Sequence, residues 1–147
     1  MPDSMLDPAT LPMRQWDYLR RRRLLAGLTI AQVARPHWIQ AESRPDAARI
    51  RADVEANVAA GERAGFTYRQ RALVETLNRS HSVDADIYRQ LTDLPMFHPT
   101  LCRCCASSEM EPRETRDGAS ARLGEDGICT ACAEDRALRA HDGRRAA

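Results

Sequence analysis

The sequence predicts a mainly α-helical chain, in which a small multi-helix part precedes a C-terminal finger built around paired cysteines. Apolar residues recur at helical spacing through the first 95 positions, without strand-like alternation. Helix start and stop residues separate these stretches into four or five short helices. Two C-x-x-C pairs then occupy the last third of the chain. We expect a disordered N-terminus (1–10), a helical domain (11–95), the finger (96–141) and a disordered tail (142–147).

Size and composition limit how large a core this chain can bury. The hydrophobic fraction of its 147 residues is 43%, but 23 of the hydrophobic residues are alanine, and only two Phe and two Trp are present. A core of this kind is modest, so a cross-link would stabilise it. All 22 basic residues are arginine, and the formal net charge is only +1. This balance argues against a nucleic-acid coat protein, and any electrostatic attraction to a partner must be local.

The start of the chain predicts a cytoplasmic protein. The opening "MPDSMLDPATLPM" is acidic and proline-rich, unlike a signal peptide. No apolar run approaches the roughly 20 residues that span a bilayer. We therefore expect no membrane association, and thiols that stay reduced. In a reducing compartment, clustered cysteines favour metal or redox chemistry over disulfides.

Helix ends are the clearest signals in the first half. Thr10 and Pro12 predict the start of a helix through "MRQWDYLRRRRLLAG". The stretches "AGLTIAQ" (26–32) and "AGFTYRQ" (64–70) share one pattern, in which Gly ends a helix and Thr caps the next with Gln as its capping-box partner. Leu28 and Val33 would form a hydrophobic staple across the first cap. We favour independent origins over duplication because the flanking sequences differ, although both alternatives stay open.

Two further helices are predicted by serine caps. Ser43 is expected to cap "RPDAARIRADVEANVAAG", and Ser82 is expected to cap "VDADIYRQLTDLP", which Pro95 would end. Asp84 and Asp86 lie in the first turn of the latter, where the helix dipole favours negative charge. The apolar stripes of this region are Ile50, Val54 and Val58; Leu73 and Leu77; and Val83, Ile87, Leu91 and Leu94.

The paired cysteines predict a metal site with four thiolate ligands. Two residues between ligands allow a tight turn to aim both sulfurs at one ion, and two such knuckles supply a tetrahedron of the kind Zn²⁺ prefers. The predicted ligands are Cys102, Cys105, Cys129 and Cys132. Cys104 is left over, because adjacent cysteines usually point apart; its exchange with Cys102 is an alternative, and His98 is a weaker one. Four thiolates close the site, so the zinc would be structural, and residues 100–140 should not fold without it. An iron–sulfur cluster and a redox dithiol remain alternatives.

The order knuckle, short hairpin around Asp117-Gly118, knuckle, helix is typical of a treble-clef or zinc-ribbon C4 zinc finger. Within that group, "LCRCC…EMEPRE…GICTACAEDRA" resembles the zinc finger of the DksA/TraR family over about residues 100–140. The resemblance implies a finger that braces a helical part, whose acidic tip enters the secondary channel of RNA polymerase. The gap between knuckles is longer here, and the upstream helices are broken. The helix dipole already explains Asp84 and Asp86 in the first turn of a helix, so we do not assign them the tip role.

Arginines are the candidates for contact with a nucleic acid or protein partner. "LRRRRLL" (19–25) is the densest positive patch, although four consecutive helical residues cannot all face one partner. A solvated helix face is the default interpretation of such a patch. The contact candidates are Arg14, Arg20, Arg21, Arg22 and Arg23 in the helical part, and Arg103, Arg113 and Arg116 in the finger.

A helix-turn-helix is a further interpretation of residues 22–43. "TIAQVA" would be its first helix, and a recognition helix would start at Pro36, with Gln40 and Arg44 reaching the DNA. The glycine usual in the turn is replaced by Trp38, which is better explained as a core residue. Catalytic motifs such as G-x-S-x-G and H-E-x-x-H are absent from the sequence, so we do not expect an enzyme.

Together these features predict a small zinc-binding regulator that acts by binding, in transcription, through RNA polymerase or DNA. The alternative is a protein–protein adaptor or inhibitor, possible for a mobile-element product, in which zinc is purely structural.

Overall fold

A computed structural model describes residues 13–145 of the chain, apart from the side chains of Pro95 and residues 143–145. The predicted disorder of residues 1–10 and the caps Thr10 and Pro12 lie outside the described residues. The chain divides into two compact units: unit 1 ends at His98, and unit 2 begins at Pro99. Across residues 13–145 there are six α-helices, two short 3-10 helices and no β-strand, so the mainly α fold class is confirmed.

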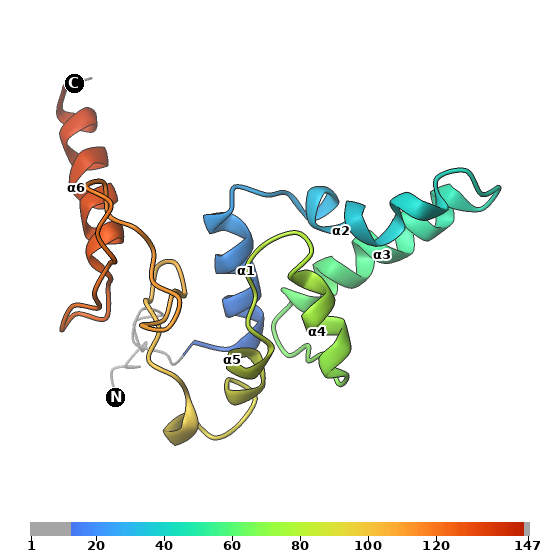
Figure 1. Cartoon of the computed structure of the whole chain (residues 1–147), viewed down its shortest axis with the longest axis horizontal. Coiled ribbons are helices and arrows are strands. Elements are labelled where there is room, and N and C mark those ends of the chain that lie inside the picture. The colour runs from blue at the N-terminus through green and yellow to red at the C-terminus, as the bar shows by residue number, and fades with distance from the viewer. Residues whose placement is uncertain (1–12, 146–147) are drawn as a thin grey trace, which may run out of the picture. The chain divides into compact units, whose positions relative to one another are not determined.

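Unit 1 is a bundle of five short helices. Helix α1 packs on α5, α2 packs on α3, and α4 packs on α5 (Figure 1). The bounds are α1 Gln15–Leu25, α2 Ile30–Trp38, α3 Ala47–Gly61, α4 Arg71–Leu77 and α5 Ala85–Gln90, with 3-10 helices η1 Ile39–Ala41 and η2 Pro95–Phe97. The most buried large side chains of this unit are Tyr18, Val33, Val74, Val83 and Leu91.

The capping box predicted at the start of α2 is present. Thr29 Oγ1 accepts a hydrogen bond from the Gln32 backbone N–H at 3.2 Å, and Gln32 Oε1 accepts one from the Thr29 N–H at 2.8 Å. Gly27, just after α1, has φ +69°, the left-handed conformation expected of a residue that ends a helix. The first of the two similar stretches therefore forms the helix ends that its sequence predicts.

The second stretch does not form its predicted capping box. Helix α4 begins at Arg71, after the Thr67–Gln70 segment, and its N-cap residue makes no side-chain cap. Thr67 Oγ1 instead accepts a hydrogen bond at 2.7 Å from Nε2 of Gln15, a buried side chain of α1. A tertiary hydrogen bond thus takes the hydroxyl that a local cap would have used.

The two serine caps are also wrong. Helix α5 begins after Asp84, whose carboxylate accepts from the backbone N–H groups of Asp86 and Ile87 at 2.7 and 3.1 Å. Helix α3 begins after Asp46, with no side-chain cap, three residues later than expected from Ser43. Of the stripe predicted for α5, Val83 and Leu91 are buried but Leu94 is 61% exposed, because the helix ends at Gln90 and not near Pro95.

Unit 2 consists of short bridged turns followed by α6, Thr130–Arg145. Antiparallel bridges join Leu101 to Ser108, Glu114 to Ser120 and Leu123 to Cys129. The predicted turn at Asp117-Gly118 is present: Gly118 has φ +81°, and the Thr115 N–H donates to the Ala119 carbonyl at 2.8 Å. Helix α6 begins before Cys132 and continues through residues 142–145, which the sequence predicts as a disordered tail. None of the helices in residues 13–145 has the length and apolar character that crossing a membrane requires.

Candidate metal centre

The four predicted ligands converge in unit 2. The sulfurs of Cys102, Cys105, Cys129 and Cys132 all lie within 4.8 Å of one another, a grouping that could hold a metal ion. The Cys105 and Cys129 sulfurs are 3.8 Å apart. A tetrahedral site with Zn–S bonds near 2.3 Å has edges of about 3.8 Å. The Cys105–Cys129 separation matches such an edge, and the four sulfurs together could hold one metal ion.

A tight turn after Cys102 forms the first knuckle. The Cys102 N–H donates to the Ser107 carbonyl at 2.9 Å, and the Ala106 N–H donates to the Cys102 carbonyl at 2.8 Å. Ala106 has φ +59°, a left-handed conformation that costs a non-glycine residue free energy. This turn brings the Cys105 sulfur back beside that of Cys102.

The second knuckle leads into α6. Gly127 has φ +75°, and a Cβ atom at this position would lie 2.9 Å from Arg103 Nε. The Arg103 N–H also donates to the Gly127 carbonyl at 2.9 Å, which joins the two knuckles through their backbones. Cys129 directly precedes α6 and Cys132 lies in its first turn, where the positive end of the helix dipole favours thiolates.

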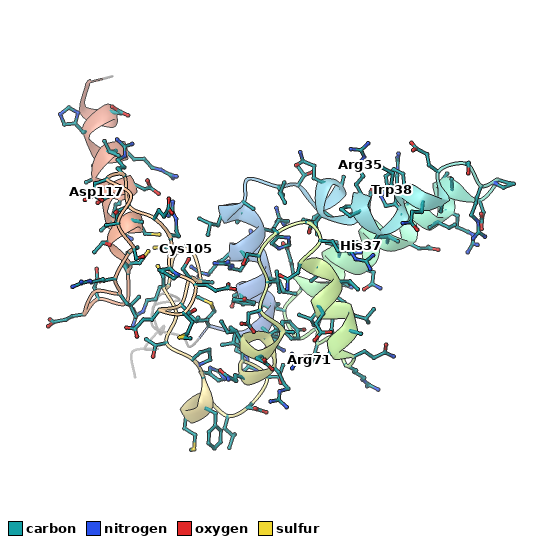
Figure 2. All side chains as sticks on the ribbon, viewed as in Figure 1. Arg35, His37, Trp38, Arg71, Cys105 and Asp117 are labelled. Carbon is teal, nitrogen blue, oxygen red and sulfur yellow. The ribbon has the colours of Figure 1, made fainter. Side chains whose placement is uncertain are left out.

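Burial separates the four ligands from the fifth cysteine. Cys102, Cys105 and Cys129 are buried, Cys132 is partly exposed, and Cys104 is exposed. Figure 2 labels Cys105 on the loop segment of unit 2 that precedes α6 in the chain. Cys104 lies outside the sulfur cluster, with Nη2 of Arg136 at 4.0 Å from its sulfur. Among the described residues, His98 is also outside the cluster, and its Nε2 is 3.0 Å from the Asp93 carbonyl.

Protons and a cation compete for these sulfurs. The hydrogen bond from the Cys105 thiol lowers the pKa of Cys102 to about 4, assisted by backbone N–H groups such as that of Cys129, 3.3 Å from the Cys102 sulfur. The same hydrogen bond raises the pKa of Cys105, and burial raises that of Cys132 to about 12. Hydrogen bonds from neighbouring groups thus stabilise the Cys102 thiolate. A divalent cation that bound the four sulfurs would displace the remaining thiol protons.

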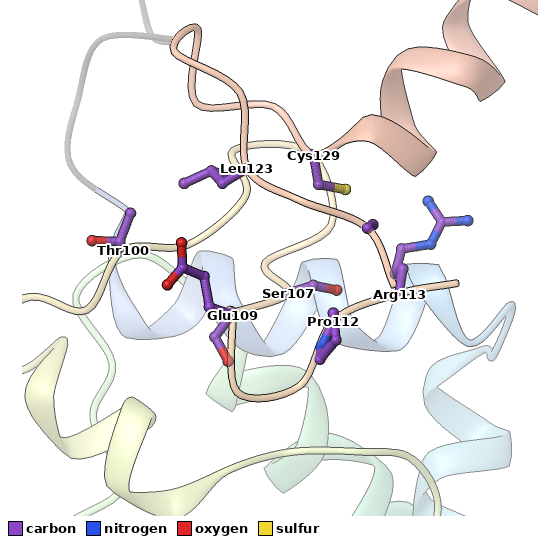
Figure 3. Close-up of a pocket in the computed structure, with 9 residues that line it drawn as sticks. Thr100, Ser107, Glu109, Pro112, Arg113, Leu123 and Cys129 are labelled. Carbon is purple, nitrogen blue, oxygen red and sulfur yellow. The ribbon is translucent and has the colours of Figure 1, made fainter. Parts of the chain in front are cut away.

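Unit 2 contains a pocket with Cys129, one of the four clustered cysteines, in its lining (Figure 3). Its lining comes from the first knuckle, the hairpin and the second knuckle: Thr100, Ser107, Ser108, Glu109, Pro112, Arg113, Ala121, Leu123 and Cys129. These are the segments that the four sulfurs hold together, so the pocket belongs to the architecture of the metal centre. A set of four thiolates leaves a tetrahedral ion no open position for a substrate.

The structure divides the predicted contact arginines into two groups. Arg22 is 8% exposed and donates to the Ser82 carbonyl at 2.9 Å, and Arg23 pairs with Glu62 through bonds of 2.6 and 2.8 Å. Arg113 donates to Cys132 and Asp135. These three guanidiniums have intramolecular partners, whereas Arg20, Arg103 and Arg116 are exposed; Arg14 and Arg21 are partly buried.

The helix-turn-helix interpretation is wrong. Helix α2 runs without interruption from Ile30 to Trp38 and contains Pro36, so the turn and the start of a recognition helix are absent from this segment. Only the 3-10 helix Ile39–Ala41 follows it. Trp38 is partly buried and packs beneath Arg51, whose guanidinium carbon is 5.8 Å from the indole centroid.

Comparisons with family models, with curated proteins and with solved structures find no match for this chain. The resemblance to the DksA/TraR finger therefore has no family match behind it, and the geometry of the cysteines carries the functional argument.

Sequence reasoning missed the immediate neighbours of the sulfurs. Ser107 Oγ lies 3.2 Å from the Cys105 sulfur, and Arg113 Nη1 reaches the Cys132 sulfur at 3.3 Å. The sequence predicts Arg113 as a partner contact, because its local sequence does not show that the hairpin turns this side chain toward Cys132. The one feature that could have indicated the contact is its position just before the hairpin that lies between the two cysteine pairs.

Proposed function

We propose that this protein binds one Zn²⁺ through Cys102, Cys105, Cys129 and Cys132 and uses it to fold unit 2. The observation that supports the proposal is the convergence of four cysteine sulfurs, within 4.8 Å of one another, in a unit with few large apolar side chains. Zinc fits a closed set of four thiolates and makes no geometric demand of its own. A structural site of this kind contributes about 10–16 kcal/mol of binding free energy at neutral pH.

Metal content in cysteine variants tests the ligand set. A Cys105→Ser variant should lose the bound metal, whereas Cys104→Ser should keep one equivalent, because Cys104 lies outside the cluster. Metal analysis of both purified variants is the measurement. The reverse result would overturn the ligand assignment, and iron with sulfide in the wild type would favour an iron–sulfur cluster.

The protein would act by binding and not by catalysis, as a cytoplasmic regulator of transcription that contacts RNA polymerase or DNA. Exposed Arg20, Arg103 and Arg116 support this proposal, because their guanidiniums are available to phosphates or to acidic protein surfaces. DNA contact would give steep salt dependence, with a log–log slope of about 0.9 for each phosphate neutralised. If the protein does not shift a random DNA duplex in a gel even at low salt, DNA is not its partner. If it does not co-purify with core RNA polymerase in a pull-down, the polymerase is not its partner.

An adaptor that binds another protein through unit 1 is the second candidate. A cavity of about 170 Å³ lies among α2, α3 and α4, with Val54, Val58, Leu73 and Leu77 in its lining. Apolar pockets of this kind accept side chains of protein partners. This function predicts that a triple Arg20→Ala, Arg103→Ala, Arg116→Ala variant still binds its protein partner with wild-type affinity. Contact with phosphate predicts instead that the same variant loses its binding to nucleic acid.

A further inference from the structure

The side chain of Arg113 bridges a metal ligand and a carboxylate. Its Nη1 donates to the Cys132 sulfur at 3.3 Å, and its Nη2 donates to Asp135 Oδ2 at 3.2 Å. Arg113 is about three-quarters buried, with 25% of its side chain exposed. The guanidinium thus bridges Cys132, a predicted metal ligand, and Asp135, three residues further along α6.

The hairpin between the knuckles sets the position of Arg113. The Ala121 N–H donates to the Arg113 carbonyl at 2.7 Å, and Glu114 bridges to Ser120 one step further along. The hairpin also contacts α6 at a second point, where the Arg116 N–H donates to Glu134 Oε2 at 3.2 Å. The segment between the two cysteine pairs therefore places the Arg113 guanidinium against the Cys132 sulfur.

Cys132 is the ligand whose sulfur accepts a hydrogen bond from the Arg113 guanidinium. Four thiolates around a divalent ion leave two negative charges, and buried charge is costly unless it is paired or hydrogen-bonded. The Cys102 sulfur receives a backbone N–H, and Cys105 and Cys129 are buried among the knuckles. Cys132 is partly exposed to solvent, and a cationic side chain approaches its sulfur.

We propose that Arg113 is a positioning residue of the metal centre, which holds Cys132 as a metal-bound thiolate and protects its sulfur from electrophiles, while Asp135 anchors the guanidinium. The inference rests on the proposed metal site. Hydrogen bonds to charged groups are stronger than neutral ones, and an N–H donor withdraws electron density from the sulfur that accepts it. The same contacts argue against Arg113 as a partner contact, because both sides of its fork are already engaged.

The test compares Arg113→Ala, Arg113→Lys and Asp135→Asn with a control, Arg122→Ala, which removes an exposed arginine from the segment after the hairpin. Zn²⁺ affinity is measured by competition with a chromophoric chelator. Alkylation of each cysteine of the zinc-loaded full chain by iodoacetamide is followed by mass spectrometry. Residues that support metal ligands typically contribute 10–100-fold in metal affinity, and partial exposure places Arg113 near the lower end.

Arg113→Ala should bind one Zn²⁺ about 10-fold more weakly and be alkylated faster at Cys132, with no such change at Cys129. Asp135→Asn should show a smaller change of the same kind. Lys keeps the charge but cannot bridge two partners as a planar fork does, so Arg113→Lys should recover only part of the affinity. Arg122→Ala should match the wild type in both measurements.

Unchanged affinity and unchanged Cys132 alkylation in Arg113→Ala would overturn the inference, as would an equal loss in Arg122→Ala. If Arg113→Ala does not fold, wild-type behaviour in both Asp135→Asn and Arg113→Lys overturns it equally. A wild-type chain that binds no zinc would overturn the proposed metal centre itself, which is a distinct result.

Discussion

The ion pair between Arg23 and Glu62 should be worth far more to unit 1 than the exposed ion pairs on its surface. Arg23 Nε and Nη2 donate to the two oxygens of Glu62 at 2.6 and 2.8 Å, and Nη1 donates to the Leu28 carbonyl at 2.8 Å. The two side chains are 13% and 12% exposed. The Glu62 hydrogen bonds raise the pKa of Arg23, so this guanidinium stays charged in the folded state.

Replacing Glu62 by Gln leaves that charge in a poorly hydrated position without its counter-ion. Breaking a fully buried pair costs about 3–5 kcal/mol, and the residual exposure reduces the expected loss to about 2 kcal/mol. For a domain of this size that loss lowers the melting temperature by roughly 10 °C. The control is Asp86→Asn, which breaks the pair between Arg71 and Asp86, whose side chains are 54% and 57% exposed.

Urea unfolding followed by tryptophan fluorescence measures both variants, because Trp16 and Trp38 both lie in unit 1. Glu62→Gln should lower the free energy of unfolding markedly, while Asp86→Asn should leave it nearly unchanged, since exposed pairs contribute little. Equal losses in the two variants would refute the reasoning from burial. No loss in Glu62→Gln would return Arg23 to the set of arginines available to a partner.

Three further predictions concern a cap, a glycine and a histidine. Thr29→Ala removes half of the capping box of α2 and should cost about 1 kcal/mol in urea unfolding, whereas Thr29→Ser should be close to neutral. Gly127→Ala meets both the left-handed backbone and the Arg103 side chain, so it should weaken zinc binding in chelator competition more than Gly118→Ala, whose added Cβ would have no close neighbour. Burial, with Arg22 nearby, lowers the pKa of His81 below 6.5, so unfolding binds a proton as pH falls through that value. Stability should therefore fall below about pH 6.5, and less steeply in His81→Gln; parallel pH profiles of the two proteins would contradict this assignment.

Local chemistry was enough to predict features whose partners lie close in sequence. The capping box of Thr29 and Gln32, the turn at Gly118 and the grouping of four cysteines each depend on residues a few positions apart or on paired knuckles with a known geometry. The mainly α character follows from periodicity in the same way. These predictions agree with the structure because little else competes for the residues involved.

Predictions failed where a distant residue took over a local role. Thr67 was expected to cap a helix, but its hydroxyl accepts from Gln15, 52 positions away. Arg23 was expected on the surface, but it pairs with Glu62, 39 positions away. No local pattern encodes such choices, since they depend on which helices pack together. The helix-turn-helix interpretation failed for a different reason: Pro36 was assigned to a helix start, although the helix containing it was already under way.

The central claim is that one metal ion, held by two pairs of sulfurs, gives unit 2 its structure. The most direct measurement follows the amide NMR spectrum of reduced, freshly purified protein of known metal content as a chelator removes the ion. We predict one zinc per chain, and collapse of the dispersed signals of residues 100–140 on its removal, while unit 1 keeps its signals because it has a core of its own. Protein that contains no transition metal, and whose residues 100–140 give the same dispersed signals with and without chelator, would contradict the account.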